Sequence, residues 1–425
     1  YYLLFIILLT YIRDIALSPL VFNFFMGYSF KTFLKHTAKD FHNQSVNPPV
    51  VRASTIIFKS MQDIRKTQKK NIKDPTGGHY DYGWQGTSTT QTLSKILTKL
   101  EESYHVFLTP TGFGSVFLAI FSVVRPGDEI IVADPVYSPT RLLTKDYLKE
   151  FNIKTKFYNP HDLNTIKKNI SKKTKLIFVE CPGSNTFEFQ DLSKIISIAK
   201  KNKIFTAIDN TWGTPYFLKP IKLGFDMSIV SATKYYSGHS DVMGGSLAVN
   251  KKVFKKVQLA EKITGLRMGP DDAYLVTRGL RTLDVRLDRH QSNAMKVASF
   301  LSKHKKIKLL YPFKKGSLNY SLWKKYYKGA SGLMGLRIKS SKKNVIKFVN
   351  SLKLFGYGYS WGGFESLALH QEIKEQGDRS YLNLSKDEHI VRLHIGLEDP
   401  KDLIEDLRRS LKFIKWVQKN LFKIN

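Results

Sequence analysis

The stretches Ile204-Phe-Thr-Ala-Ile-Asp209 and Asp226-Met-Ser-Ile-Val-Ser231-Ala-Thr-Lys234 decide the fold of this 425-residue chain. Each contains an apolar run that predicts a buried strand, and each ends in polar residues. A carboxylate at the carboxyl end of such a strand points into the crevice where open α/β sheets bind ligands. We therefore expect Asp209 and Lys234 to lie one strand apart at the same edge of a sheet.

Lys234 lies just past its strand, between residues that carry hydroxyl groups. Most lysines in such places are solvated, and an aspartate after a strand commonly caps a turn. Together, however, the two residues match the needs of pyridoxal phosphate. Its aldehyde forms a Schiff base with a lysine, and its pyridine nitrogen needs an acid that keeps it protonated. Ser231 and Thr233 are placed to hold its phosphate.

Strands and helices alternate along the middle of the chain, which predicts an α/β fold with a mostly parallel sheet and crossover helices. The predicted strands are residues 106–108, 129–132, 154–158, 176–180 and 205–209, and the predicted helices are 90–102, 114–124, 138–150 and 191–201. Residues 27–86 show little periodicity and are predicted to be extended. A long helix from about residue 281 leads into an α+β part that ends in a helix over 403–417.

We divide the chain into an N-terminal extended arm (26–86), a cofactor-binding domain (87–284) and a smaller C-terminal α+β domain (285–425). Residues 1–25 are two short apolar pieces around Arg13-Asp14, and each is too short for a membrane span. They also lack the basic start and the cleavage site of a signal peptide. We interpret them as upstream sequence and expect the natural start at Met26.

Several motifs occur in an order that identifies a family. They are Tyr82-Gly-Trp-Gln-Gly-Thr87, Pro110-Thr-Gly-Phe-Gly114, Arg278-Gly-Leu-Arg-Thr-Leu283, Tyr359-Ser-Trp-Gly-Gly-Phe-Glu-Ser366 and Arg392-Leu-His-Ile-Gly-Leu-Glu-Asp399. With the lysine and aspartate segments, they resemble the Cys/Met-metabolism family of pyridoxal-phosphate enzymes from about residue 47 to 411. The resemblance implies the fold-type-I transferase-like architecture and a homo-oligomer, at least a dimer and usually a tetramer.

The resemblance also implies roles for single residues. The amides of Gly112 and Phe113 bind the cofactor phosphate, and Tyr137 stacks on the ring and helps to move the substrate α-proton. A phenol near a cation has the lowered pKa that this role needs. Arg392 clamps the substrate α-carboxylate, as a guanidinium does bidentately. Ser360 and Trp361 line the substrate side.

One position departs from the family pattern. In the family, a tyrosine and an arginine reach across a dimer interface to the phosphate of the neighbouring subunit. This chain keeps Tyr82 but has Trp84 where the arginine is expected. One charge-assisted contact, worth roughly 1.5–3 kcal/mol, is then missing. Either the cofactor binds more weakly or another cation supplies the contact.

Trp361, Pro182-Gly-Ser184 and the Arg-Leu-His run at Arg392 resemble the β-lyase branch of the family. That branch implies β-elimination from L-cystathionine, which yields L-homocysteine, pyruvate and ammonia, as in methionine biosynthesis. Three alternatives stay open: a γ-acting synthase or lyase, an amino-acid racemase that uses Lys234 and Tyr137, and a basic binding protein without activity. The intact set of Lys234, Asp209 and Arg392 disfavours the last.

The net charge of +33 is carried by lysines that are scattered along the chain without a recognition motif. We interpret it as a solvated surface that also attracts an anionic cofactor and substrate, and we expect no nucleic-acid, membrane or metal partner. The partner is then a small amino-acid substrate. The single cysteine excludes an intrachain disulfide, which fits a cytoplasmic protein.

Overall fold

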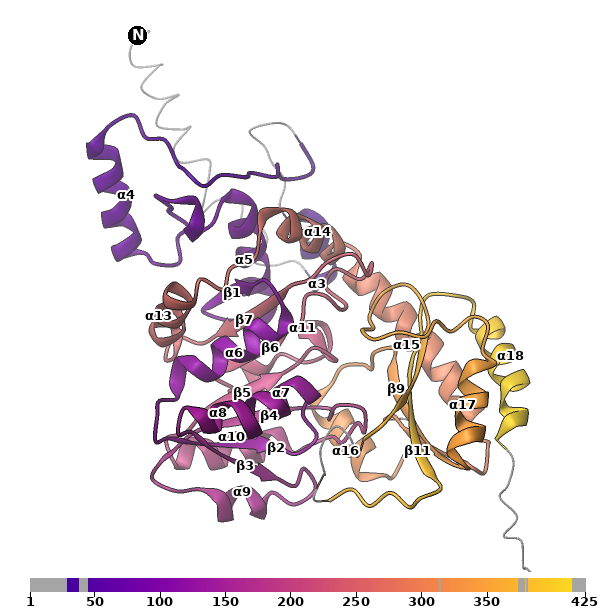
Figure 1. Cartoon of the computed structure of the whole chain (residues 1–425). Coiled ribbons are helices and arrows are strands. Elements are labelled where there is room, and N and C mark those ends of the chain that lie inside the picture. Colours follow the sequence, from indigo (N-terminus) through magenta and orange to yellow (C-terminus); the bar gives the residue numbers. More distant parts are fainter. Residues whose placement is uncertain (1–28, 38–44, 313–314, 374–378, 380, 415–425) are drawn as a thin grey trace, which may run out of the picture.

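A seven-stranded sheet forms the middle of the larger part of the molecule (Figure 1). Its strand order is β1-β7-β6-β5-β4-β2-β3. The strands from β6 to β3 run parallel, and β7 is antiparallel to both of its neighbours. The bounds are β1 (His105–Thr109), β2 (Glu129–Ala133), β3 (Lys154–Tyr158), β4 (Thr174–Glu180), β5 (Phe205–Asp209), β6 (Met227–Val230) and β7 (Gly245–Val249).

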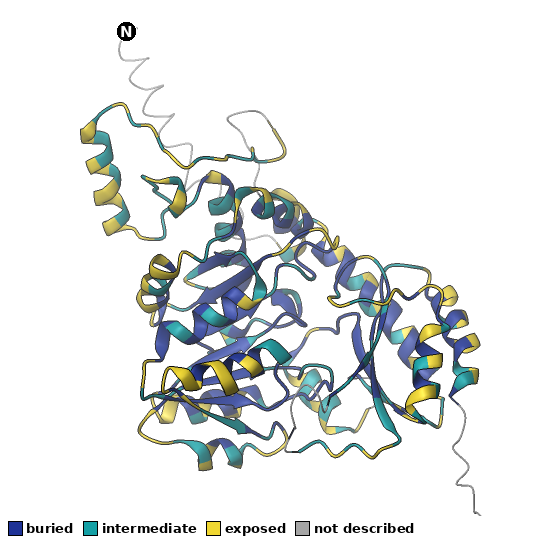
Figure 2. Ribbon diagram, in the orientation of Figure 1, coloured by how far each residue is buried: buried dark blue, intermediate teal, exposed yellow. Residues whose placement is uncertain are grey.

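Helices cover this sheet, and those between successive parallel strands are the crossovers that the alternating pattern predicts. The covering helices are α5 (Ser88–Glu101), α6 (Gly112–Val123), α7 (Ser138–Leu142), α8 (Leu148–Glu150), α9 (Asn164–Asn169), α10 (Leu192–Lys201), α11 (Thr214–Phe217), α12 (Pro220–Leu223), α13 (Phe254–Thr264) and α14 (Pro270–Leu280). The predicted helix over 138–150 is divided, because a π-helical turn at Leu143–Tyr147 separates α7 from α8. Figure 2 shows the strands buried between these helices.

The long helix α15 (Leu283–Leu301) leads into the second part, whose four-stranded antiparallel sheet has the order β10-β11-β9-β8. Its elements are β8 (Ile307–Leu310), α16 (Leu318–Tyr326), β9 (Leu333–Lys339), α17 (Lys342–Asn350), β10 (Leu367–Gln371), β11 (Glu388–His394) and α18 (Pro400–Ser410). The predicted α/β fold with a smaller α+β part is therefore confirmed. The exact domain boundaries stay a prediction.

Two sequence predictions need correction. The segment predicted to be extended contains α3 (Phe30–His36) and α4 (Met61–Lys73). The hydroxyls of Ser29 and Ser60 cap these helices, but α4 has too few apolar residues for a clear helical period. The last helix begins at Pro400 and gives way to a 3₁₀ turn (Leu411–Phe413), so it is shorter at its C-terminal end than predicted.

The structure is a computed structural model that describes residues 29–37, 45–312, 315–373, 379 and 381–414. The predicted upstream segment 1–25 lies outside the described residues. Within them, the length and apolarity of every helix fall short of what a membrane span requires.

Candidate active site

Lys234 lies in the loop that follows β6, at the carboxyl edge of the parallel strands. Its Nζ donates a hydrogen bond to Ser360 Oγ at 2.9 Å. Burial and the guanidinium of Arg392 lower the pKa of the amine to about 8, although the Asp209 carboxylate opposes this effect. About a tenth of the amine is therefore neutral at pH 7, far more than for an ordinary lysine, and the neutral form is the one that attacks an aldehyde or accepts a proton.

Asp209 ends β5, next to β6, as the sequence predicts. Its carboxylate accepts a hydrogen bond from the backbone amide of Thr211 at 2.9 Å. Burial raises its pKa despite the Thr211 hydrogen bonds and the charge of Lys234. The charged form of a buried carboxylate is stabilised by a positive charge beside it, and the protonated pyridine nitrogen of pyridoxal phosphate would supply that charge. The surroundings of Asp209 therefore fit the nitrogen end of the cofactor ring.

The first turn of α6 matches a phosphate site. Thr111 caps the helix by accepting from Gly114 N at 2.9 Å, and the amides of Gly112 and Phe113 belong to the first turn, which has no intrahelical acceptor. A Cβ at Gly112 would lie 2.4 Å from Ser231 Oγ, so only glycine lets this turn approach the Ser231 loop.

Thr233 lies on the same loop, but its hydroxyl is already engaged. It donates to Gly244 O at 3.2 Å and accepts from Gly244 N at 3.0 Å. The hydroxyl has to turn away from the Gly244 carbonyl before it can donate to a phosphate. The helix amides and Ser231 are free of this constraint and fit the phosphate directly.

Tyr137 lies above the same sheet edge, with 49% of its surface exposed. Its amide donates to the Glu180 carboxyl at 2.6 Å. The expectation of a lowered phenol pKa is wrong for this structure. Burial and the carboxyl groups of Glu180 and Asp209 raise the pKa, and Arg392 only partly offsets them.

Glu180 is a residue of the site that the sequence reasoning missed. It ends β4 and pairs in register with Asp209 on β5, so two carboxyl groups meet at neighbouring strand ends. Burial first, and then the charge of Asp209, raise the pKa of Glu180 well above its ordinary range. The strand ending in Glu180 was visible in the sequence, but the proximity of the two acids depends on strand order.

Arg392 projects from β11 and connects the second sheet to the site. Its guanidinium donates to the carbonyl of Ser360 at 2.9 Å and to that of Gly358 at 3.4 Å. Burial lowers its pKa to about 10, which leaves it charged. In the described part of the chain, no carboxylate forms an ion pair with this guanidinium, so a substrate carboxylate would find a cation without a competitor.

Ser360 and Trp361 lie opposite Lys234 on the loop before β10. The Trp361 ring centre is 5.7 Å from Lys234 Nζ. Ser360 adopts φ of +70°, which is unusual for a residue with a side chain and implies that its neighbours hold it in place. The loop therefore presents a hydroxyl and an aromatic ring to the lysine.

The arm residues lie apart from this cluster. Tyr82 is 53% exposed. Trp84 stacks under the guanidinium of Arg267, 4.5 Å from its ring centre, and Arg267 also pairs with Glu261 at 2.6 Å and donates to the carbonyl of Gln85. The sequence predicted that Trp84 removes one contact to the cofactor phosphate unless another cation supplies it. Arg267 is a cation beside Trp84, and its role toward the phosphate stays a prediction.

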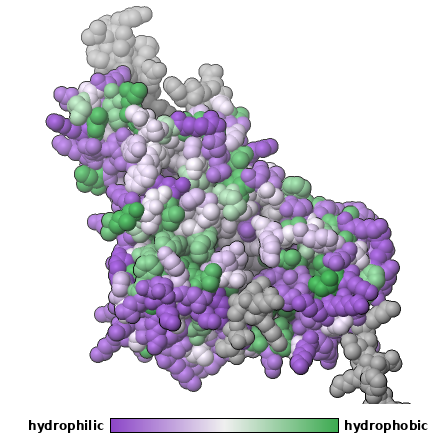
Figure 3. All heavy atoms as spheres, viewed as in Figure 1, coloured by the Kyte–Doolittle hydropathy of each residue, from purple (hydrophilic) through white to green (hydrophobic). Residues whose placement is uncertain are grey.

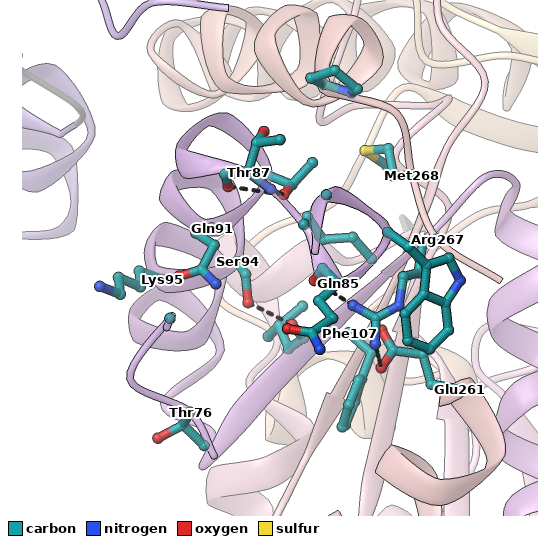
Figure 4. A pocket seen from close by; sticks show the side chains of 18 of the residues that line it. Thr76, Gln85, Thr87, Gln91, Ser94, Lys95, Phe107, Glu261, Arg267 and Met268 are labelled. Atoms are coloured by element: carbon teal, nitrogen blue, oxygen red, sulfur yellow. Dashed lines mark hydrogen bonds and ion pairs between the residues drawn. The ribbon is translucent and has the colours of Figure 1, made fainter. Parts of the chain in front are cut away.

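Figure 4 shows the cavity around this stack, which has a volume of about 450 Å³. Its described walls come from the arm, α5, β1 and α13 and include neither Lys234 nor Arg392. The raised pKa of Glu261, about 7, reflects its burial, while Arg267 favours its charged form. This cavity is thus separate from the lysine cluster.

The same family emerges from comparison with known proteins. The family profile described as Cys/Met metabolism PLP-dependent enzyme matches residues 31–412. The chain belongs to this family. A putative cystathionine beta-lyase of Rhizobium johnstonii is 37% identical over 378 residues, which cover 87% of this chain and 92% of that protein.

Other members of the family that are similar to this chain bear different names. An L-alanine/L-glutamate racemase of Wolbachia pipientis wMel is 36% identical, over 86% of this chain and 92% of that protein. The crystal structure of cystathionine gamma synthase from Xanthomonas oryzae pv. oryzae superposes with a TM-score of 0.83 at 28% identity, covering 92% of this chain and 99% of that one. The chain is therefore a pyridoxal-phosphate-dependent enzyme of Cys/Met metabolism with the fold-type-I architecture.

Proposed function

We propose that the protein is a carbon–sulfur β-lyase that converts L-cystathionine and water into L-homocysteine, pyruvate and ammonia. The observation that carries the proposal is the charged Arg392 guanidinium, held by the Ser360 carbonyl next to the Lys234 amine. An amino-acid substrate whose α-carboxylate binds Arg392 would then have its Cα near the Lys234 amine. Trp361 and the Arg-Leu-His run favour the β-lyase branch.

The chain's own groups would act as follows. Lys234 would hold pyridoxal phosphate, which would supply an electron sink for the substrate carbon that loses its α-proton. The freed Lys234 amine removes that proton, and its pKa of about 8 suits transfer in both directions. The same amine then protonates the sulfur that leaves Cβ. Asp209 holds the ring-nitrogen proton, and Glu180 fixes the backbone of Tyr137.

A second candidate is racemisation of a small amino acid. It is favoured by the similarity to the Wolbachia racemase and by a second protonated group, Tyr137, at the sheet edge. A γ-acting lyase or synthase would use the same cofactor residues. Neither alternative needs the protonation of a sulfur leaving group at Cβ, so the products separate all three.

We further propose a homo-oligomer, at least a dimer, whose arm packs on a second copy of the chain. None of the described side chains of α4 is buried, and Figure 3 shows hydrophobic residues on α4, along α13 and over α6 on one face. Exposed apolar side chains include Met61 and Ile72 on α4, Leu259 and Ile263 on α13, and Ile57 in the segment before α4. An apolar surface of this kind favours association.

The cytoplasmic location stays a prediction.

The test is an absorption spectrum of the purified protein, followed by addition of L-cystathionine. We expect a cofactor band near ~420 nm, and pyruvate and homocysteine in equal amounts. Bound cofactor without pyruvate would contradict the β-lyase proposal, and D-alanine formed from L-alanine would identify the racemase. A protein that binds no cofactor even with excess pyridoxal phosphate would contradict the enzymatic site as a whole.

A further inference from the structure

His394 lies behind the candidate site, in a motif to which the proposed chemistry assigns no role. It ends β11 two residues after Arg392, so the strand places both side chains on one face. Its ring is fully buried. Gly362 N donates to His394 Nε2 at 3.1 Å, and Nδ1 lies 2.9 Å from the carbonyl of Glu365.

These two contacts determine the state of the imidazole. An amide N–H can only donate, so Nε2 is an acceptor. A carbonyl can only accept, so Nδ1 carries the proton. The ring is therefore neutral, and burial keeps its pKa well below the ordinary range, with the neighbouring His290 and Arg392 acting in the same direction. Both ring nitrogens bond to the loop that contains Ser360 and Trp361.

The bonded loop residue lies directly on the reactive lysine. A Cβ at Gly362 would lie 3.0 Å from the carbonyl carbon of Lys234, and φ of Gly362 is +89°, so glycine is required on both counts. Two residues earlier, Ser360 accepts from Lys234 through its hydroxyl and from Arg392 through its carbonyl, each at 2.9 Å. A displacement of Gly362 would alter both contacts.

We propose that His394 is a positioning residue that holds the Ser360–Gly363 loop and thereby sets the distance between the Lys234 amine and the Arg392 guanidinium. The inference rests on the proposed function in one respect, since it takes Arg392 as the group that binds the substrate carboxylate. The groups that pack behind His394 support a fixed ring. His290 lies 5.1 Å away, ring to ring, with its Nδ1 2.8 Å from the carbonyl of Ile395, and Tyr235 contacts the Trp361 ring at 5.5 Å.

Two variants separate the acceptor from the donor of His394. His394→Gln keeps an acceptor near the position of Nε2, and His394→Asn keeps only a donor near Nδ1. The probe is glycine, which has no leaving group, titrated against the cofactor band of the holoenzyme. We expect His394→Asn to weaken glycine binding about tenfold, because the Gly362 amide is left without an acceptor. His394→Gln should stay within about threefold of the parent protein.

The comparison of the two variants is decisive. Equal glycine affinities for the Gln and Asn proteins, whatever their melting temperatures, would overturn the proposal, because a purely structural ring would affect both alike. If the Asn protein does not fold, His394→Met, which has a similar size and no strong acceptor, takes its place. With L-cystathionine, the Asn variant should raise KM more than it lowers kcat. Failure of the parent protein to cleave cystathionine would contradict the proposed function, while the glycine titration would still test His394.

Discussion

The sheet edge and the N-terminal arm hold their charged and aromatic side chains in different ways. At the sheet edge, Asp209 and Glu180 end neighbouring strands, and Lys234 hydrogen-bonds to a loop of the second sheet. On the arm, Trp84 is held by one cation, Arg267, whose charge is balanced by Glu261. Helix α4 buries no described side chain.

The difference shows that a single chain brings together the charged groups of the candidate site but leaves side chains of the arm exposed. At the sheet edge of a single chain, the Lys234 amine and the Arg392 guanidinium both bond to Ser360, and the Asp209 carboxylate is near enough to act on the amine electrostatically. The arm exposes Tyr82 and the apolar side chains of α4. Under the proposed oligomer, the arm is the part that a second copy completes.

The largest expected effect is at the sheet edge. Lys234→Ala should remove the cofactor band and lower kcat about 10⁴-fold, because the amine both binds the cofactor and transfers the proton. Absorption spectra and steady-state rates of the purified variant check this. Lys219 provides the control. Its amine pairs with Glu102 and has no predicted role at the cofactor, so Lys219→Ala should leave the band unchanged. A residual rate within tenfold of the parent would be incompatible with the proposed role.

On the arm side, Arg267→Gln should lower the stability by about 3 kcal/mol, because it leaves the buried Glu261 without its cation. The matched control is the double variant Arg267→Gln with Glu261→Gln, which removes both charges and should recover most of the loss. Thermal unfolding at pH 8 measures the difference. Equal losses for the single and double variants would mean that the lost stability does not come from an unpaired Glu261.

Arg392→Lys should raise KM for the amino-acid substrate about 10- to 100-fold, since a point charge replaces a bidentate contact. The cofactor band should persist, because the guanidinium contacts the Ser360 loop and not the predicted phosphate site. Steady-state kinetics with matched cofactor loading provide the measurement. An unchanged KM would remove Arg392 from the substrate site.

The lowered pKa of Lys234 predicts how the apoenzyme takes up its cofactor. Only the neutral amine attacks the aldehyde, and the folded pKa of about 8 lies below the ordinary value of 10.5. The rate of band formation after mixing with pyridoxal phosphate should rise about tenfold per pH unit below pH 8 and level off above it. Stopped-flow absorbance from pH 6 to 9 tests this. A rate that is still rising at pH 9 would place the pKa of the amine near its ordinary value.

The smallest expected effect is that of Trp84→Leu, which removes the ring under Arg267 and should cost about 0.5–1 kcal/mol. Trp84→Phe keeps a ring and should cost less. Both variants are compared by thermal unfolding and by the dissociation constant of pyridoxal phosphate. If Trp84→Leu weakens cofactor binding far more than it lowers stability, Trp84 acts at the cofactor and not only on the arm.

Much of the sheet could be predicted because its signals are local. The strands β3 and β5 have the predicted bounds, and Asp209 ends its strand as expected. Strand β7 was not predicted, because a short apolar run after Gly244-Gly245 does not reveal that it pairs between β1 and β6. The arm helices were missed since their first turns depend on serine caps and α4 lacks an apolar stripe.

The sequence by itself predicted the mostly parallel sheet, the position of Lys234 and Asp209 at its edge and the family to which the chain belongs. Periodicity, strand ends and ordered motifs carry that information along the chain. Only the tertiary structure decided the raised pKa of Tyr137, the Glu180–Asp209 pair, the Arg267 stack on Trp84 and the contact of His394 with Gly362. Each of these joins groups from separate elements, and electrostatic and hydrogen-bond energies depend on distances that the order of residues does not specify.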